Sequence, residues 1–162
     1  MRTIVVGLGN PILSDDSVGI KVAALVRERL PADAGIDMTE AYAGGLRLME
    51  AIAGYDRAII VDAMKSGAHP PGTIMRLSLD SPATTRNTLC THDGELSTAL
   101  ALGRDLGLAM PESIEIIGIE AAEVEQFGEE LTQGVSGALP QAVAEVLRLC
   151  GVRDFALKRG RP

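Results

Sequence analysis

Aromatic residues are scarce in this chain of 162 residues, which contains two Tyr, two Phe and no Trp. Basic residues are also few, with 15 Lys and Arg against 22 Asp and Glu, so the formal net charge is -7 at pH 7. Proteins that bind nucleic acid usually present a basic surface or aromatic side chains that stack on bases. The composition therefore argues against nucleic acid as a partner.

Long apolar runs and cysteine frameworks are missing as well. The apolar runs are broken by Gly, Pro or charged residues, and none reaches the length needed to span a bilayer. The first of them is interrupted by Asn10 and Pro11 and has no small-residue cleavage site after it, unlike a signal peptide. Cys90 and Cys150 lack a CxxC spacing, and Cys150 lies on an apolar stripe typical of a core. We expect a cytoplasmic protein that does not associate with membranes.

The length and the 46% hydrophobic content are those of one globular domain. A chain of this size buries roughly 70% of its unfolded surface, so it needs neither disulfides nor a structural metal. Small aliphatic side chains must fill the core. We predict one domain over residues 1–157, followed by a frayed basic tail at residues 158–162, and a monomeric protein.

Apolar runs rich in β-branched residues alternate with helical patterns along the chain. The last helical pattern contains Pro140, which either kinks the helix or marks its start. No helix is predicted between the third and fourth strands, so the fourth is expected antiparallel at an edge. The pattern predicts a three-layer αβα sandwich of the α/β class, with a mostly parallel five-stranded sheet and one antiparallel edge strand. Strands are predicted at 3–8, 36–41, 57–61, 73–79 and 113–119, and helices at 18–30, 46–53, 93–106 and 135–150.

Acidic side chains follow two of the predicted strands. In an open α/β sheet, ligands bind beyond the carboxyl ends of the strands, where the strand order reverses. Asp15 and Asp16 follow the turn after the first strand, and Asp62 stands at the tip of the third. Each acid alone could cap a helix or a loop. Three carboxylates converging on one crevice instead require a cation or a proton, which favours a functional site.

Histidine is the other candidate ligand type, and the chain has only two. His69 lies in the loop after the third strand, and His92 precedes the third predicted helix. Either loop can reach the crevice. A set of two Asp and one His leaves coordination positions open and suits a first-row divalent metal.

A dinucleotide-binding motif is the competing interpretation of the N-terminal turn. Gly7-Leu8-Gly9 begins like G-x-G-x-x-G, but Ile12 stands at the third glycine position and Pro11 lies inside the turn. Glu40 could serve as the acid that binds a ribose. The match is weak, and a nucleotide-binding domain is the less favoured alternative.

The sequence resembles the hydrogenase maturation endopeptidases, which trim the large subunits of nickel-iron hydrogenases. The resemblance begins with an N-terminal signature and continues in order over nearly the whole chain. The matching blocks are Gly7-Leu8-Gly9-Asn10-Pro11, Ser14-Asp15-Asp16-Ser17-Val18-Gly19, Gly44-Gly45, Val61-Asp62-Ala63, Pro71-Gly72-Thr73, His92, Gly118-Ile119-Glu120, and Leu131-Thr132 followed by Val135 and Pro140.

The resemblance implies an αβα fold and a protease that removes the C-terminal extension of a hydrogenase large-subunit precursor after nickel insertion. It also implies that Asp16, Asp62 and His92 bind the metal, a divalent ion supplied as nickel by the precursor. Asp16 and Asp62 are then the catalytic carboxylates as well. A nickel checkpoint that binds the precursor without hydrolysis would use the same ligands.

Two positions in this assignment carry alternatives. Asp93 follows His92 where family members often have Gln, so His69 is kept as the alternative ligand. Asp15 is a candidate general base, because an acid that does not bind the metal could take a proton from water.

Overall fold

A five-stranded sheet forms the centre of the computed structural model, which describes residues 1–81, 83, 85–90 and 94–152. The strands lie in the order β2-β1-β3-β7-β4. All neighbours pair in parallel except β4, which runs antiparallel to β7 at the edge, as predicted. A separate two-stranded ladder joins β5 to β6. The strands are β1 (Thr3–Leu8), β2 (Ile36–Ala41), β3 (Arg57–Met64), β4 (Ile74–Leu77), β5 (Leu89–Cys90), β6 (Gly94–Glu95) and β7 (Ser113–Glu120).

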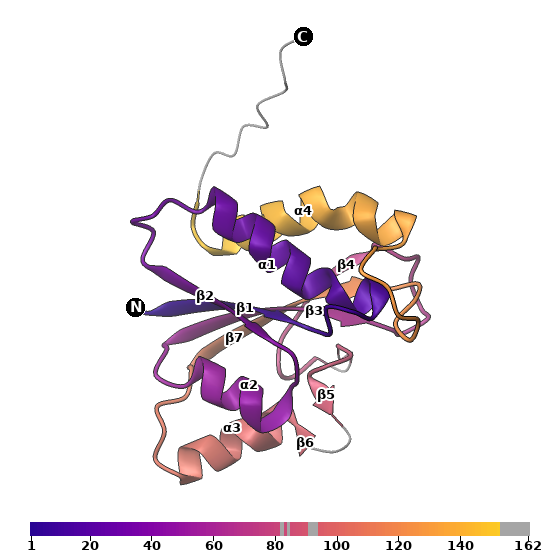
Figure 1. Cartoon of the computed structure of the whole chain (residues 1–162). Helices are drawn as coiled ribbons and strands as arrows, with labels where there is room; N and C mark the ends of the chain where they lie inside the picture. Colours follow the sequence, from indigo (N-terminus) through magenta and orange to yellow (C-terminus); the bar gives the residue numbers. More distant parts are fainter. Residues whose placement is uncertain (82, 84, 91–93, 153–162) are drawn as a thin grey trace.

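Helices cover both faces of this sheet, which confirms the three-layer sandwich (Figure 1). Helix α4 begins directly after Thr132 and contains Pro140, so Pro140 does not mark the start of the helix. The predicted 93–106 helix begins later than expected, and the predicted tail at residues 158–162 lies outside the described residues. The helical elements are the 3-10 turn η1 (Ser14–Ser17), α1 (Val18–Arg29), α2 (Gly45–Ile52), α3 (Leu96–Asp105) and α4 (Gln133–Leu149).

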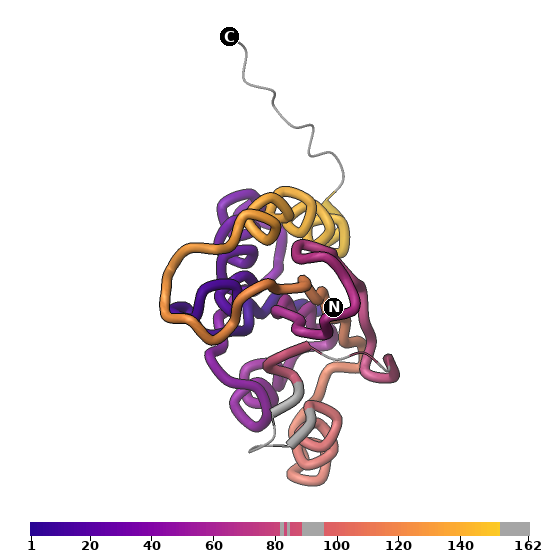
Figure 2. Tube along the Cα trace, turned by 90° about the vertical axis from the view of Figure 1, so that its right-hand side faces the viewer, coloured from indigo at the N-terminus to yellow at the C-terminus, as the bar shows by residue number. Residues whose placement is uncertain are grey.

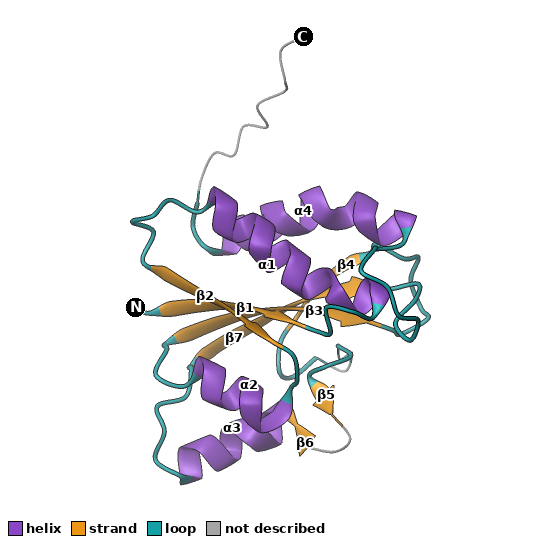
Figure 3. Ribbon diagram, viewed as in Figure 1, coloured by secondary structure: helices purple, strands orange, loops and turns teal. Residues whose placement is uncertain are grey.

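Alternating side chains of the central strands point to opposite faces of the sheet and form two cores. Val5 and Ile59 belong to the core under α1 and α4, whereas Ile4 and Ile60 belong to the core over α2 and α3. Figure 3 shows these two helix layers on either side of the strands. Because both faces are covered, the central strands are continuous apolar runs, which is the pattern that made them predictable.

Cys150 and the length of the apolar helices are the subject of two smaller predictions from the sequence. Cys150 is half-buried against the core under α1 and α4, and burial raises the pKa of its thiol to about 11. Among the described residues, no helix is long and apolar enough to cross a bilayer.

The carboxyl ends of the parallel strands lie at one edge of the sheet, which we call the carboxyl edge. The chain leaves β1 toward β2 on one side and reaches β3 on the other, so the strand order reverses between β1 and β3. Figure 2 views the molecule from this edge, where the loops after these strands surround the strand ends. The switch point therefore lies beside the ends of the two strands that carry Asp16 and Asp62 toward the site.

Candidate functional site

Asp62 lies at the carboxyl edge because it is the first residue of β3 beyond the pairing with β1, which ends at Val61. It is completely buried. Three nitrogens donate to its carboxylate: the backbone N of Ala63 (2.9 Å to Oδ1), the side-chain Nδ2 of Asn87 (2.8 Å to Oδ1) and the backbone N of Asn87 (2.7 Å to Oδ2). A rigid strand and a fixed set of donors therefore hold this carboxylate in one orientation.

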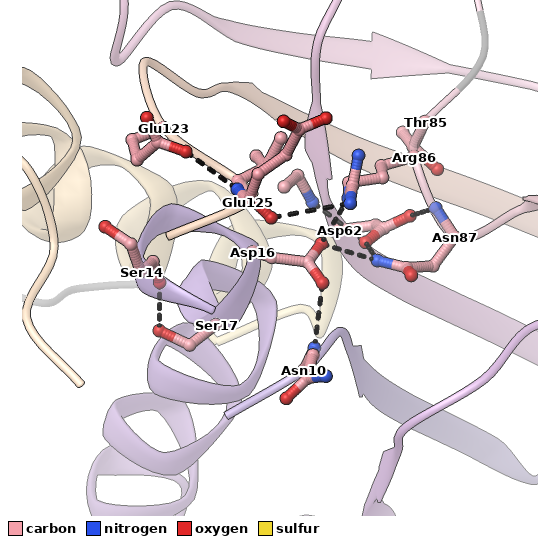
Figure 4. Close-up of polar contacts among 12 residues, drawn as sticks. Asn10, Ser14, Asp16, Ser17, Asp62, Thr85, Arg86, Asn87, Glu123 and Glu125 are labelled. Atoms are coloured by element: carbon pink, nitrogen blue, oxygen red, sulfur yellow. Dashed lines mark hydrogen bonds and ion pairs between the residues drawn. The ribbon is translucent and has the colours of Figure 1, made fainter. Parts of the chain in front are cut away.

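Asp16 reaches the same point from the turn η1, just before α1. It is 2% exposed, and its two oxygens have different partners (Figure 4). The backbone N of Asn10 donates to Oδ2 (3.1 Å), while the Asn87 Nδ2 donates to Oδ1 (2.9 Å). The Arg86 Nε lies 3.3 Å from the same Oδ1. Asp16 is thus a buried carboxylate paired with a guanidinium.

Close backbone contacts bring Asp16 onto the strand ends. A Cβ on Gly19 in the first turn of α1 would lie 2.2 Å from the Val61 carbonyl oxygen and 2.5 Å from that of Leu8. Only a glycine at this position lets α1 begin directly on the ends of β1 and β3. Ser14 before it has a φ of 46°, a left-handed conformation that is costly for a residue with a side chain. Hydrogen bonds from Ser14 to the carbonyls of Gly128 and Glu130 hold it there.

Burial has an electrostatic consequence at Asp62. Removal from water disfavours the charged carboxylate and raises the pKa of Asp62 to about 7, and the negative charge of Asp16 acts in the same direction. Hydrogen bonds from Asn87 and Thr85 oppose this increase in the pKa. Asp62 therefore takes up a proton far more readily than an exposed Asp does.

The geometry of the pair suits a shared cation. One oxygen of Asp16 and one of Asp62 lie 2.9 and 2.8 Å from a single atom, the Asn87 Nδ2, so both carboxylates point at one position. Carboxylate oxygens are ligands for divalent first-row metals. Among the described residues, no group of three His, Cys, Asp or Glu side chains is close enough to hold a metal ion. Two ligands of the predicted set converge here.

Only one of the two histidines lies among the residues that the structure describes. His69 is exposed in the loop after β3, which leaves the carboxyl edge. His92 lies outside the described residues. The choice between them as the third ligand therefore stays a prediction.

Asp15 is also buried, but its contacts link it to the loop between β7 and α4. Its Oδ2 accepts hydrogen bonds from the backbone N of Ala122 (2.9 Å), the backbone N of Glu123 (3.0 Å) and the Thr132 hydroxyl (2.8 Å), and its Oδ1 accepts one from the Thr132 N (2.7 Å). Four donors saturate this carboxylate. These hydrogen bonds anchor the 122–132 loop to η1.

The N-terminal turn that resembles a dinucleotide motif has its N–H groups engaged inside the protein. The Gly9 N donates to the Ala41 carbonyl (3.0 Å), and the Asn10 N donates to Asp16. Pro11 has no N–H, and the Ile12 N donates to the Asn10 side chain (3.1 Å). A phosphate site needs such groups to point at the ligand, whereas here the turn binds Ala41, Asp16 and its own Asn10 side chain.

Sequence reasoning missed Arg86, which contacts Asp16, and Asn87, which contacts both carboxylates; they come from the segment between β4 and β5. The sequence pattern marks this stretch only as polar, although buried acids require compensating donors. That requirement predicts an amide or basic partner without saying which residue supplies it. The Gly44-Gly45 block was a usable signal, since a Cβ on Gly44 would lie 1.9 Å from the Asn87 carbonyl oxygen. Gly44 thus makes room for the segment that carries Arg86 and Asn87.

An αβα sandwich with two buried carboxylates at its switch point has the form of an enzyme site. Comparison with known proteins makes this specific. The model of the hydrogenase maturation protease family matches residues 11–149 of this chain. The chain belongs to this family, and it is a hydrolase of the peptidase type.

Individual relatives agree with the family match. The chain is 28% identical over 149 residues to the hydrogenase 2 maturation protease of Escherichia coli K12, covering 91% of this chain and 89% of that protein. It is 26% identical over 164 residues to the hydrogenase expression/formation protein HupD of Rhizobium leguminosarum, covering 98% and 80%.

Solved structures share the fold along almost the full length. The hydrogenase maturating endopeptidase HybD from Escherichia coli superposes with a TM-score of 0.76 at 27% identity, covering 92% of this chain and 91% of that one. The NiFe hydrogenase maturation protease HybD from Thermococcus kodakarensis gives a TM-score of 0.71 at 28% identity, covering 93% and 99%. The α/β architecture predicted from the sequence is therefore that of known maturation proteases.

Proposed function

We propose that this protease removes the C-terminal extension of a nickel-iron hydrogenase large-subunit precursor after nickel has been inserted, and that it recognises the nickel through Asp16 and Asp62. The observation that supports this most directly is the convergence of the two buried carboxylates on one position. The relative from Thermococcus kodakarensis, which is a NiFe hydrogenase maturation protease by name, supports the metal.

Nickel is part of the substrate in this proposal. An ion held by thiolates of the precursor has open coordination positions, and the oxygens of Asp16 and Asp62 would fill two of them. His92 would supply a third ligand, with His69 as the alternative. A precursor without nickel would lack this contact, so the protease would select the loaded form.

Hydrolysis of the peptide bond then needs an activated carbonyl or water beside the carboxylates. The nickel brought by the substrate can polarise either one. A carboxylate oxygen left free of the metal can accept the proton of the attacking water. We assign this role to the Asp16–Asp62 pair rather than to Asp15, because Asp15 already accepts four hydrogen bonds from the loop that it anchors.

The experiment is the incubation of a purified, nickel-loaded large-subunit precursor with this protein, followed by intact-mass spectrometry. We expect the wild type to remove a C-terminal peptide. Asp16→Asn and Asp62→Asn should each slow the cleavage by at least about a hundredfold, the contribution of a positioned acid or base. Asp33→Asn is the matched control, because Asp33 is an exposed acid in the loop between α1 and β2, at the opposite edge of the sheet.

Other outcomes would contradict parts of the proposal. Full cleavage by Asp16→Asn and Asp62→Asn would remove both carboxylates from the mechanism. A stable complex with no loss of mass would indicate a nickel checkpoint without hydrolysis. Full cleavage by His92→Ala would transfer the third ligand position to His69.

A further inference from the structure

The side chain of Asn87 lies at the position on which the two carboxylates converge (Figure 4). Its Nδ2 donates one hydrogen bond to Asp16 Oδ1 (2.9 Å) and one to Asp62 Oδ1 (2.8 Å). An amide NH2 group has two hydrogens and no acceptor capacity on the nitrogen. Both hydrogens are used here, and each neutralises part of the negative charge of one carboxylate.

Arg86 completes the compensation from the same segment. Its Nε lies 3.3 Å from Asp16 Oδ1, the oxygen that also accepts from Asn87, and its Nη2 donates to the Val124 carbonyl (3.4 Å). The Arg86 backbone N donates to the Ala63 carbonyl (2.8 Å), next to Asp62. The carboxylate pair is therefore covered by one guanidinium and one amide from neighbouring residues.

A cation cannot share this position with the amide. The carboxylate oxygens that would bind it are the oxygens that accept from Asn87, and an N–H group directed at a cation is repulsive. The backbone around Asn87 is fixed by its own N–H bond to Asp62 (2.7 Å) and by the close approach of its carbonyl to Gly44. For a cation to bind here, the Asn87 NH2 group must therefore leave this position, by a movement or a rotation of the side chain, while the backbone stays in place.

We propose that Asn87 is a specificity-determining residue that occupies the cation position of the Asp16–Asp62 pair and so excludes free divalent ions. To bind here, a free ion must lose part of its hydration shell and displace the two hydrogen bonds of the Asn87 amide, and it gains only two carboxylate ligands. An ion already held in a polypeptide has lost part of its water, and its polypeptide adds contacts of its own that offset the displacement. This inference rests on the proposed recognition of substrate-bound nickel.

The test is the binding of Ni²⁺ alone to the full-length protein, measured by titration calorimetry. Asn87→Ala should bind free Ni²⁺ about tenfold more tightly than the wild type, because two competing hydrogen bonds are gone. Arg86→Gln should bind it more tightly by a smaller factor, since Arg86 contacts only Asp16 of the two acids. Asn10→Ala is the matched control, because only its backbone contacts Asp16, and it should bind like the wild type.

The results separate this inference from the proposed function. Equal or weaker Ni²⁺ binding by Asn87→Ala would overturn the inference, and weaker binding would show in addition that Asn87 helps to hold the carboxylates for the metal. If Asn87→Ala does not fold, as judged by its melting curve, Asn87→Ser removes the same bridging amide with a smaller change in polarity. Tighter binding by the variant, together with a failure of the wild type to cleave loaded precursor, would uphold the inference and remove the proposed function alone.

Discussion

Asp62 has an environment that is unusual for a side chain of its type. It is a completely buried acid whose carboxylate accepts three hydrogen bonds from nitrogen donors, and its pKa is nevertheless raised to about 7. The hydrogen bonds compensate only part of the cost of burying a charge beside Asp16. The fold therefore maintains a carboxyl group that is unfavourable when ionised, and such perturbed groups are concentrated at functional sites.

This raised pKa predicts how stability depends on pH. The folded protein holds the Asp62 proton more tightly than the unfolded chain, so the stabilisation is fully present below about pH 4 and is lost as the pH rises through about 7. Between pH 5 and pH 8 the wild type should lose roughly 2–3 kcal/mol of unfolding free energy relative to Asp62→Asn. Urea unfolding of both proteins at the two pH values measures this. Parallel curves would show that Asp62 titrates as an exposed acid does.

Asp15 illustrates a different use of a buried carboxylate only one residue from Asp16. It takes four hydrogen bonds from residues 122–132, so it stabilises the loop that precedes α4. The two neighbouring acids of η1 thus have different partners: Asp15 binds the 122–132 loop, and Asp16 points toward Asp62 and Asn87. Such a division follows from the geometry of a turn, in which consecutive side chains point to different sides.

At the scale of elements, the site depends on how closely α1 approaches the strands. Gly19 permits that approach, since a Cβ there would lie 2.2 Å from one strand carbonyl and 2.5 Å from another. Backbone atoms of buried strands cannot move aside as a flexible side chain can. The position of η1, and hence that of Asp16, is set by this helix–sheet contact.

A pair of glycine substitutions tests this contact. Gly19→Ala should lower the free energy of unfolding by about 3 kcal/mol, because overpacking forces α1 away from the sheet. Gly137→Ala on α4 is the control, since a Cβ there meets no atom within 4 Å. It should raise the free energy of unfolding by about 0.5–1 kcal/mol through helix propensity. Chemical denaturation measures both, and a neutral Gly19→Ala would contradict the proposed role of the contact.

At the scale of the whole molecule, the strand order places the site. The order β2-β1-β3-β7-β4 reverses between β1 and β3; Asp16 follows β1, and Asp62 lies near the carboxyl end of β3. Many α/β proteins bind nucleotides at the same place. Here the N–H groups that would bind a phosphate donate to Ala41, Asp16 and Asn10 instead.

Because the N–H groups of this turn are already bonded within the protein, we expect it not to bind nucleotides. Addition of NAD or ATP at millimolar concentration should shift the melting temperature by less than about 1 °C, because a ligand stabilises only a fold that offers it a site. The measurement is a thermal melt with and without each nucleotide. A saturable increase of several degrees would show that the N-terminal turn binds nucleotides after all.

The sequence by itself determined the layers, the five strands of the sheet and the antiparallel edge strand. Buried strands and amphipathic helices are local patterns, and each is written in consecutive residues such as Ile59, Ile60 and Val61. It also placed Asp16 and Asp62 beside each other, because the carboxyl ends of neighbouring parallel strands share one edge. Its predictions of a monomer and of a cytoplasmic location stay predictions.

Only the tertiary structure decided what surrounds those two acids. Asn87 is 25 residues from Asp62 and 71 from Asp16 along the chain, and no local pattern links them. The same holds for the bonds between Asp15 and Thr132, which are 117 residues apart. Burial, which raises the pKa of Asp62, is likewise a property of the packed chain. Residue types in sequence can nominate the carboxylates, but long-range contacts set their charge and their partners.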